Sequence, residues 1–305
     1  MLSYLNNDIT LDEAIEKGIA AAGYATERIG NIWDLTKQLA EGKTWDLVFN
    51  IAEGFRGIGR EAQVPALLDA YNIPYTFSDP MVLSLSLHKG MTKRVLRDLK
   101  LATSNFAEVS SADDAKNIDL PYPLFVKPIA EGTSKGVSLT SIVKNKKELI
   151  EECSRLLKIF NQSVLVETFL PGREFTVGIL GTGNNAKSLG CMEVLLHANA
   201  EQGVYSYNNK ENYEELVKYA LAEDNVSIEV EKLALAAYRG LGCRDAGRVD
   251  IRLDKNGKPN IIELNPLAGL HPVRSDLPMI CNFKKIPYND LIRGILDSAM
   301  TRIEI

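Results

Sequence analysis

The sequence is poor in the residues from which thiolate and imidazole metal sites are built. Its 305 residues include four cysteines, which are far apart, and three histidines, which are scattered. No pair has the spacing of a zinc motif or of a disulfide framework. We therefore expect buried, reduced thiols, a cytoplasmic location and no metal site made of histidine. The cysteines are Cys153, Cys191, Cys243 and Cys281.

The chain also has no excess of basic charge and no long apolar run. The net charge is −5 and the isoelectric point is near 5.5. Because no basic stripe carries interleaved aromatic residues, nucleic acid is not an expected partner. No apolar stretch is long enough to span a bilayer, and residues 1–10 lack the pattern of a secretory signal. The length and the 45% of hydrophobic residues are typical of a soluble protein with two or three lobes.

Helix and strand patterns alternate along the chain and predict a mixed α/β fold. A capping box, formed by Thr10 and Glu13, opens the first helix. The expected helices cover residues 10–23, 62–72, 79 onward, 89–100, 144–160, 226–241 and 289–302. The expected strands cover residues 45–50, 123–128, 137–143, 163–169, 174–180, 188–196, 247–254 and 260–265. A polar stretch over residues 197–212 is expected to form a mobile loop.

The strongest local pattern is a hairpin centred on Asn256-Gly257. Both turn positions tolerate positive φ, so this dipeptide favours a two-residue turn. In that register Asp250 faces Glu263, and Arg248 faces Asn265. Strand alternation then separates a polar face from an apolar face. The polar face has Arg248, Asp250, Arg252, Glu263 and Asn265, and the apolar face has Val249, Ile251, Leu253, Ile262 and Leu264.

The opposed carboxylates of this hairpin make a candidate metal site. Two carboxylates facing each other on neighbouring strands repel unless a cation lies between them. Mg²⁺ prefers oxygen ligands and is often held by carboxylates together with substrate phosphates. Asp250, Glu263 and Asn265 provide such ligands. A solvated outer face with arginine–carboxylate pairs explains the hairpin pattern equally well.

Five motifs match one protein family in the order that the family has them. They are HKGMTKRVL at 88–96, PLFVKPIAEGTSKGVSL at 123–139, VLVETFLPGREFTVGIL at 164–180, YSYNNK at 205–210 and the hairpin at 248–269. On these motifs the chain resembles the D-alanine–D-alanine ligases of the ATP-grasp superfamily. The resemblance implies an α/β fold with α+β lobes in three domains, residues 1–84, 85–170 and 171–305, the first a partly truncated Rossmann-like domain. It also implies ATP, Mg²⁺ or Mn²⁺, small amino-acid or peptide substrates, and a homodimer.

The resemblance assigns ATP to the first three motifs. Lys93 and Lys127 match lysines that contact phosphates, and Lys127 lies in an apolar run where an unpaired ammonium group is costly. A surface charge is the simpler interpretation of a lone lysine, and a plain turn is the simpler interpretation of the glycine-containing loop. The other implied ATP residues are Glu131, Thr133 and Ser134 over the phosphates, Glu167, Thr168, Phe169 and Leu170 at adenine, and Glu174 at the ribose.

The resemblance also implies a reaction in two steps. A substrate carboxylate attacks the γ-phosphate to form an acyl phosphate, and the amine of a second substrate then displaces phosphate. Arg248 would stabilise the charge that develops at the acyl centre, and Lys210 would close over the γ-phosphate. The protein contributes positioning and charge neutralisation, and we expect no nucleophile from the chain itself.

The sequence departs from the family at the amino-acid subsites. Glu53 stands where the family has a histidine, Arg60 lies in a segment that is acidic in the family, and Glu211 replaces a tyrosine. Charged groups in a cleft favour a substrate with a charged or larger polar side chain, so D-alanine alone is expected to be a poor substrate pair. The candidate substrate residues are Glu53, Arg60, Gly269, Arg274 and Ser275, with Arg274 and Ser275 as alternatives for the acceptor carboxylate.

Two other functions compete with a ligase. An ATP-binding protein of the same fold without ligase turnover is the alternative, although the complete polar face of the hairpin argues against it. A dinucleotide oxidoreductase is suggested by Gly54, Gly57 and Gly59. Their spacing does not fit the dinucleotide fingerprint, and no early βαβ unit carries them.

Overall fold

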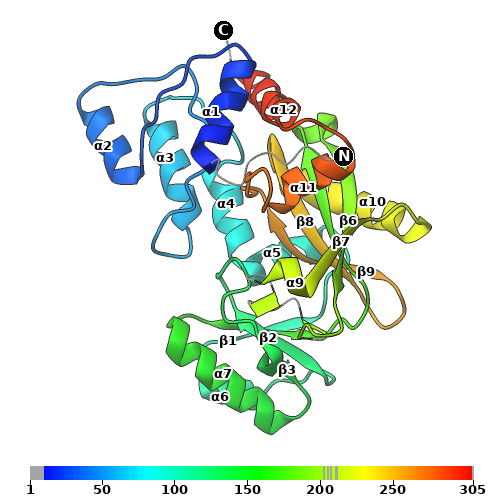
Figure 1. Ribbon diagram of the computed structural model, residues 1–305. Coiled ribbons are helices and arrows are strands. Elements are labelled where there is room, and N and C mark those ends of the chain that lie inside the picture. The colour runs from blue at the N-terminus through cyan, green and yellow to red at the C-terminus, as the bar shows by residue number, and fades with distance from the viewer. Residues whose placement is uncertain (1–9, 202, 205, 207, 210–211, 304–305) are drawn as a thin grey trace.

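The computed structural model describes residues 10–201, 203–204, 206, 208–209 and 212–303 (Figure 1). Its strands form two antiparallel sheets. The smaller sheet has the order β1-β4-β2-β3, with β1 (Phe106–Val109), β2 (Leu124–Pro128), β3 (Ile142–Val143) and β4 (Val164–Thr168). The larger sheet has the order β7-β6-β5-β8-β9, with β5 (Glu174–Leu180), β6 (Lys187–Leu196), β7 (Val217–Leu221), β8 (Ala246–Leu253) and β9 (Pro259–Asn265).

The smaller sheet is covered on one face by helices α6 (Ala112–Lys116) and α7 (Lys146–Phe160), at the bottom of Figure 1. Side-chain alternation along each strand decides which residues face these helices. Val126 of β2 and Val166 of β4 are buried in that core. Their neighbours Lys127 and Glu167 therefore point to the opposite face, which is turned toward the larger sheet.

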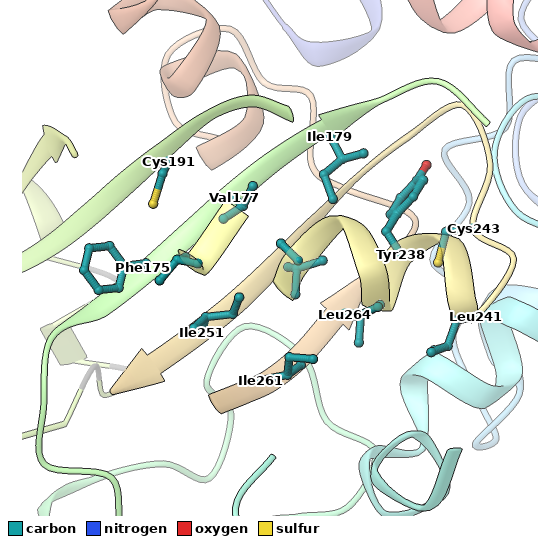
Figure 2. Packing of buried hydrophobic residues seen from close by; sticks show 14 of the residues in the cluster. Phe175, Val177, Ile179, Cys191, Tyr238, Leu241, Cys243, Ile251, Ile261 and Leu264 are labelled. Carbon is teal, nitrogen blue, oxygen red and sulfur yellow. The ribbon is translucent and has the colours of Figure 1, made fainter. Parts of the chain in front are cut away.

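The larger sheet packs one face against α10 (Asn225–Gly240), and this contact forms the main core of the molecule (Figure 2). Phe175, Val177 and Ile179 of β5 alternate toward the helix and are fully buried. Tyr238 of α10 packs among them and is 1% exposed. Because the odd-numbered positions of β5 and β8 enter this core, the even-numbered positions form the other face of the sheet.

Helix α11 (Asp276–Phe283) lies against that other face, where two glycines pair across neighbouring strands. Gly178 of β5 is opposite Gly190 of β6. A Cβ atom built at Gly178 would lie 2.9 Å from the Leu277 side chain, and one at Gly190 would lie 3.2 Å from the Ile280 side chain. The absence of side chains at these two positions therefore allows α11 to approach the sheet closely.

Of the remaining helices, α1, α2, α3 and α12 lie at the end of the molecule away from the smaller sheet (Figure 1). Helix α1 packs against α12, so the first and last described helices lie side by side. A Cβ at Gly18 of α1 would lie 2.8 Å from the Ile292 side chain of α12, so this packing needs glycine. The helices that cover neither the α6–α7 side of the smaller sheet nor the α10 and α11 sides of the larger sheet are α1 (Leu11–Ala21), α2 (Ile32–Ala40), α3 (Gln63–Ala70), α4 (Pro80–Leu87), α5 (Lys89–Asp98), α9 (Tyr213–Leu216) and α12 (Tyr288–Met300). Among the described residues, none of the helices combines the length and apolarity that crossing a membrane requires.

Two predicted strands are wrong. The strand over 45–50 is reduced to one parallel bridge, between Val48 and Tyr75, and no regular strand occurs in described residues 10–105. The strand over 137–143 is instead a 3₁₀ turn, Leu139–Ser141, followed by the two-residue β3. Here the Ser138 amide donates to Ser141 Oγ at 3.1 Å, and this local bond favours the turn over a strand. The sequence patterns also do not predict α2, α6, α9, α11, β1 and β7.

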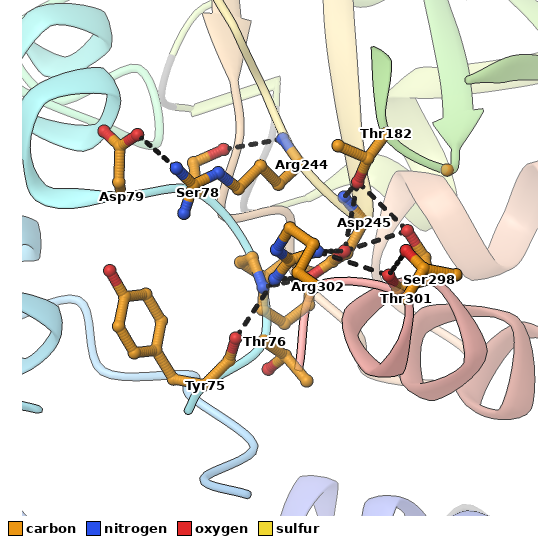
Figure 3. Close-up of polar contacts among 12 residues, drawn as sticks. Tyr75, Thr76, Ser78, Asp79, Thr182, Arg244, Asp245, Ser298, Thr301 and Arg302 are labelled. Carbon is orange, nitrogen blue, oxygen red and sulfur yellow. Dashed lines mark hydrogen bonds and ion pairs between the residues drawn. The ribbon is translucent and has the colours of Figure 1, made fainter. Parts of the chain in front are cut away.

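Asp245 connects three parts of the chain at the end of α12 (Figure 3). Its side chain is fully buried and receives the Phe77 amide at 2.7 Å, the Ser298 hydroxyl at 2.9 Å and both terminal nitrogens of Arg302. Arg302 also donates to the Tyr75 carbonyl at 3.2 Å. This cluster therefore joins the N-terminal region and the C-terminal helix to the loop that leads into β8.

Replacing Asp245 with Asn is expected to lower the free energy of unfolding by about 3–5 kcal/mol, because it leaves the buried face of Arg302 without a countercharge. Asparagine keeps the volume and tolerates the positive φ of 62° at this position. Urea unfolding at neutral pH measures the change. The matched control is Asp113→Asn, whose partner Lys116 forms a surface ion pair that contributes about 0–1 kcal/mol. Equal losses in the two variants would contradict this role.

Candidate active site

A cleft lies between the two sheets and is lined by residues of both. Strands β2 and β4 line it from the smaller sheet, and β5, β8 and β9 line it from the larger one. The even-numbered face of β5 and β8 that does not enter the core provides much of its polar surface. The predicted site residues that line the cleft are Lys127, Glu131, Ser134, Glu167, Thr168, Phe169, Leu170, Glu174, Arg248, Asp250 and Glu263.

Glu167 binds two buried lysines at one side of the cleft. Lys93 Nζ lies 2.5 Å from Glu167 Oε1, and Lys127 Nζ lies 2.7 Å from Oε2. Ser104 Oγ also donates to Oε1 at 2.8 Å. Burial alone would raise the pKa of Glu167, but the ammonium groups of Lys127 and Lys93 outweigh it and lower this pKa to about 2.

This cluster has one net positive charge, two ammonium groups against one carboxylate, in a place where the side chains are 1–7% exposed. Glu263 and Glu174 also act on Lys127 and help to raise its pKa, while burial lowers the pKa of Lys93. An anion beside the Lys127 ammonium group would stabilise its charged form further. Lys127 lines the cleft and can meet such an anion directly, whereas Lys93 is not among the lining residues. The two lysines predicted at phosphates are therefore together, with Lys127 the one that is accessible.

The polar face of the hairpin opens into the cleft in the predicted register. Asp250 pairs with Glu263, and Arg248 pairs with Asn265. Asp250 accepts hydrogen bonds from Asn265 Nδ2 at 3.1 Å and from Thr176 Oγ1 at 3.0 Å. Two carboxylates therefore face the cleft together, and they are oxygen-bearing groups of the kind that hard divalent cations prefer. The predicted third ligand, Asn265, contacts Asp250 but is not among the residues that line the cleft.

The turn and the strand pairing that produce this register differ from the prediction in two places. The turn has three residues between Asp254 and Lys258, and Gly257 has φ of 75°. A bulge then shifts the register by one residue beside the two carboxylates. The bulge turns Ile261 into the core, where it is fully buried, and leaves Ile262 in the cleft. Placing Ile262 on the apolar face was therefore wrong, while the longer turn and the bulge cancel for Asp250 and Glu263.

Basic side chains lie beside both carboxylates of the hairpin. Arg248 Nη1 donates to Asp250 Oδ1 at 3.0 Å and also to Asp276 Oδ2 at 2.7 Å. Lys89 Nζ lies 3.2 Å from Glu263 Oε2 and donates to the Glu131 carbonyl at 2.6 Å. The repulsion between Asp250 and Glu263 is thus partly relieved by the chain's own cations.

Two aromatic rings also line the cleft. Phe125 and Phe169 stack with their centroids 6.5 Å apart and an interplanar angle of 26°. The Arg252 guanidinium lies 5.5 Å from the Phe169 ring centroid, and its Nη1 is 3.2 Å from Glu174 Oε2. Thr168 Oγ1 is buried and has no hydrogen-bond partner among the described residues. Apolar faces next to an unsatisfied hydroxyl and a carboxylate are suited to a planar base with attached hydroxyl groups.

The loop after β2 contributes less side-chain chemistry than predicted. Thr133 and Ser134 both have positive φ, 53° and 55°, which is unusual for residues with a side chain. Ser134 lines the cleft with Lys135, but Thr133 is exposed and is not among the lining residues. The Glu131 carboxylate accepts a hydrogen bond from Gln162 Nε2 at 2.7 Å, which ties the loop to the smaller sheet's side.

Two predicted substrate residues, Glu53 and Arg60, lie on a 3₁₀ turn, Arg60–Ala62, and the loop before it. Arg60 Nη1 donates to the Ala130 carbonyl at 3.0 Å and so connects this turn with the loop after β2. Glu53 is exposed. Burial raises the pKa of the neighbouring Glu61 to about 7, and the negative charges of Glu53 and Glu263 act in the same direction. Glu61 is thus part of the electrostatic surroundings of the hairpin carboxylates.

The predicted acceptor-side residues lie just before α11. Ser275 Oγ accepts the His271 amide at 3.0 Å, and a Cβ at Gly269 would lie 2.7 Å from that oxygen. Gly269 therefore provides space for Ser275, and Arg274 is exposed. None of the three predicted residues lines the cleft, while Asp276 of α11 contacts Arg248.

Sequence reasoning missed Lys89, Glu61 and Asp276 near this site and gave no role to Arg252. Lys89 lies four residues before Lys93 in one motif, and this spacing puts both on one helix face, which was a usable signal. Asp276 had no comparable signal, because helix α11 was not predicted. Lys210 and Glu211 lie outside the described residues, and mobility of the stretch 197–212 stays a prediction.

The fold and the cleft are those of an ATP-grasp enzyme, and comparisons with known proteins agree. A family model described as the D-ala D-ala ligase C-terminus matches residues 95–297. The D-alanine–D-alanine ligase of Bordetella avium is 32% identical over 250 residues, which cover 80% of this chain and 76% of the relative. An uncharacterized protein, y4sG, of Sinorhizobium fredii is 31% identical, with 85% and 76% of the two chains covered.

Solved structures give the same result. The D-alanine–D-alanine ligase of Bacillus anthracis in complex with ATP superimposes with a TM-score of 0.68 at 25% identity, covering 87% of this chain and 83% of that one. The chain therefore belongs to the D-alanine–D-alanine ligase family. It is an ATP-dependent ligase with the ATP-grasp fold that the motifs predicted.

Replacing Glu167 with Gln is expected to lower the free energy of unfolding by roughly 3–5 kcal/mol, because two buried ammonium groups lose their countercharge. The loss depends on pH in a definite direction. The folded-state pKa of Glu167 is about 2 and its ordinary value is 4.5, so its contribution is complete above about pH 4.5 and declines as the pH falls toward 2. Urea unfolding is the measurement. The difference in free energy of unfolding between wild type and variant should stay constant from about pH 6 to 8 and become smaller by about pH 3.5. A difference that is the same at every pH would count against this account.

Proposed function

We propose that this ligase uses Mg²⁺ together with ATP to join the carboxylate of one amino acid or small peptide to the amine of another. The observation that carries the proposal is the pairing of Asp250 with Glu263 across the β8–β9 hairpin, within the same cleft as the Lys93–Glu167–Lys127 cluster. A cation site beside an anion site is what a metal–phosphate complex requires.

The ligands present fit Mg²⁺. The described residues contain no group of three or more His, Cys, Asp and Glu side chains that could hold a metal by themselves. The proposed ligands from the chain are two carboxylates, Asp250 and Glu263, and the Asn265 amide. Mg²⁺ is commonly held by one or two carboxylates, with phosphate oxygens and water completing its shell. When bound, the ion would neutralise charge on the phosphates.

The residues of the chain have separate tasks in the proposed reaction. Lys127 presents its ammonium group to phosphate oxygens, and Glu167 holds that group in place. Arg248 lies at the hairpin beside Asp250, where its guanidinium can stabilise negative charge on the reacting carbonyl oxygen. The substrate carboxylate attacks the γ-phosphate and ADP leaves, after which the second substrate's amine attacks the carbonyl carbon, phosphate leaves and the amine loses a proton.

The part of the cleft lined by the two aromatic rings is the proposed site of the nucleoside. The Arg252 guanidinium lies over the Phe169 ring, and it also contacts Glu174, which we assign to the ribose hydroxyls. Thr168 Oγ1 has no hydrogen-bond partner among the described residues and could bond to the nucleoside. This leaves the side near Arg60 and Glu61 for the amino-acid substrates. A cytoplasmic location and a homodimer belong to the same proposal, as does the assignment of residues 1–84, 85–170 and 171–305 to three domains.

Replacing Glu263 with Gln is expected to lower phosphate release by on the order of a hundredfold or more while leaving the fold intact, since a charged metal ligand is lost. Steady-state phosphate release at several Mg²⁺ concentrations tests this, and excess Mg²⁺ should recover part of the rate. Glu151→Gln is the control, because it is the same chemical substitution at an exposed position of α7. Unchanged turnover of the Glu263 variant at limiting Mg²⁺ would contradict the metal site.

D-alanine alone is expected to be a poor substrate pair, with another amino acid or small peptide preferred as at least one partner. The physical reason is the charge beside the cleft, where Glu53, Arg60 and Glu61 lie close enough to influence one another. ATP consumption with D- and L-amino acids, singly and in pairs, tests the expectation, and mass spectrometry identifies the products. The highest rate with D-alanine alone, and D-alanyl-D-alanine as the main product, would show it to be wrong.

A further inference from the structure

The side of β5 that does not face α10 is matched to the same side of β8. Three cross-strand pairs lie there: Glu174 with Arg252, Thr176 with Asp250, and Gly178 with Arg248. The first is an ion pair, with 3.2 Å between Glu174 Oε2 and Arg252 Nη1. In the second, the Thr176 hydroxyl group donates a hydrogen bond to Asp250 Oδ1 at 3.0 Å. The proposed metal ligand on β8 is therefore the residue of this face that receives a neutral hydroxyl group from β5.

The sheet itself directs the Thr176 hydroxyl group to Asp250. Thr176 lines the cleft, yet it is only 4% exposed. Its neighbour on the other side, across β6, is Met192, which is fully buried and apolar. Of these two cross-strand neighbours only Asp250 is a strong hydrogen-bond acceptor. The pairing of rigid strands, rather than a loop, therefore sets this contact.

Neutral donors hold the Asp250 carboxylate from both neighbouring strands. Strand β8 lies between β5 and β9, and Thr176 of β5 donates to Oδ1 while Asn265 of β9 donates to Oδ2 at 3.1 Å. Arg248 Nη1 also lies 3.0 Å from each oxygen. A guanidinium group repels an approaching cation, whereas a hydroxyl group carries no net charge and can stay on the carboxylate. A carboxylate has enough lone pairs to accept a hydrogen bond and bind a cation together.

We propose that Thr176 is a positioning residue for the metal, because its hydroxyl group holds the Asp250 carboxylate in the orientation in which it faces Glu263 across the hairpin. The inference rests on the proposed function, where Asp250 and Glu263 are the charged ligands of Mg²⁺. Groups that orient a metal ligand without touching the metal commonly contribute roughly ten- to a hundredfold to metal affinity. Loss of the hydroxyl group therefore weakens metal binding although every ligand is still present.

Two substitutions of Thr176 test this role. Thr176→Val removes the hydroxyl group and keeps a branched side chain of similar size that suits a strand, whereas Thr176→Ser keeps the hydroxyl group. Mn²⁺ is the probe, because electron paramagnetic resonance measures the free ion and gives a dissociation constant without turnover. Each protein is titrated with an equimolar non-hydrolysable ATP analogue present, and the analogue alone is the blank. The dissociation constant should rise by about tenfold or more in Thr176→Val and stay within about twofold of wild type in Thr176→Ser.

Thr182→Val is the matched control. The Thr182 hydroxyl group also donates to an aspartate, Asp245 Oδ1 at 3.2 Å, but neither residue lines the cleft. The control therefore removes the same kind of hydrogen bond and should leave Mn²⁺ affinity unchanged. Glu263→Gln is the reference for the metal site itself, and it should weaken Mn²⁺ binding because it loses a charged ligand.

The set of variants separates the role of Thr176 from the metal site. Weaker Mn²⁺ binding in Glu263→Gln with unchanged binding in Thr176→Val overturns the role and leaves the metal site in place. An equal loss in Thr176→Ser, or in Thr182→Val, also overturns it, because the hydroxyl group on Asp250 would then not be the cause. Unchanged binding in both Glu263→Gln and Thr176→Val, or no binding by the wild type beyond that of the analogue, contradicts the proposed metal site and the role together.

Discussion

The buried carboxylate of Glu167 between two lysines is the interaction on which the site depends. It connects α5 and β2 to β4. Thr103 donates to the Ile261 carbonyl and accepts from Lys93, so the same cluster also contacts the larger sheet. One carboxylate contacts two lysines in a nearly dry place, where burial lowers the pKa of Lys93. Such an arrangement is costly by itself, and the proposed binding of phosphate beside Lys127 would offset part of that cost.

The larger sheet complements this charge with its own polar face. Strand alternation gives β8 one side for the core and one for the cleft, so Arg248 and Asp250 are held by the same backbone that packs Val249 against α10. Rigid strands position the reactive groups, and the loops around them supply selectivity. Gly178 and Gly190 have no side chains, so α11 packs closely on the sheet. Asp276, the first residue of this helix, therefore contacts Arg248.

Much of the fold could be predicted from the sequence, and the reasons are local. The capping box at Thr10 and the N-caps of α4, α7 and α10 define helix starts within a few residues. The strand predicted over 45–50 failed because its partner contributes only Tyr75, so a single bridge forms where a β-propensity pattern predicted a ladder. Lys127 was recognisable as a site residue, since a lysine in an apolar run needs a partner.

The sequence by itself determined that Arg248, Asp250, Arg252 and Glu263 share the face of the hairpin that lines the cleft, because side chains in a strand change sides at every step. It did not place Ile262, which the bulge leaves in the cleft. Only the tertiary structure decided the length of the turn and the position of the bulge. A three-residue turn moved the register by one position, and a bulge at Ile262 moved it back, so Asp250 and Glu263 met as predicted although the turn was of another type. Asp276 and Lys89 were likewise decided in three dimensions, since their partners Arg248 and Glu263 lie 28 and 174 residues away and no local pattern encodes such contacts.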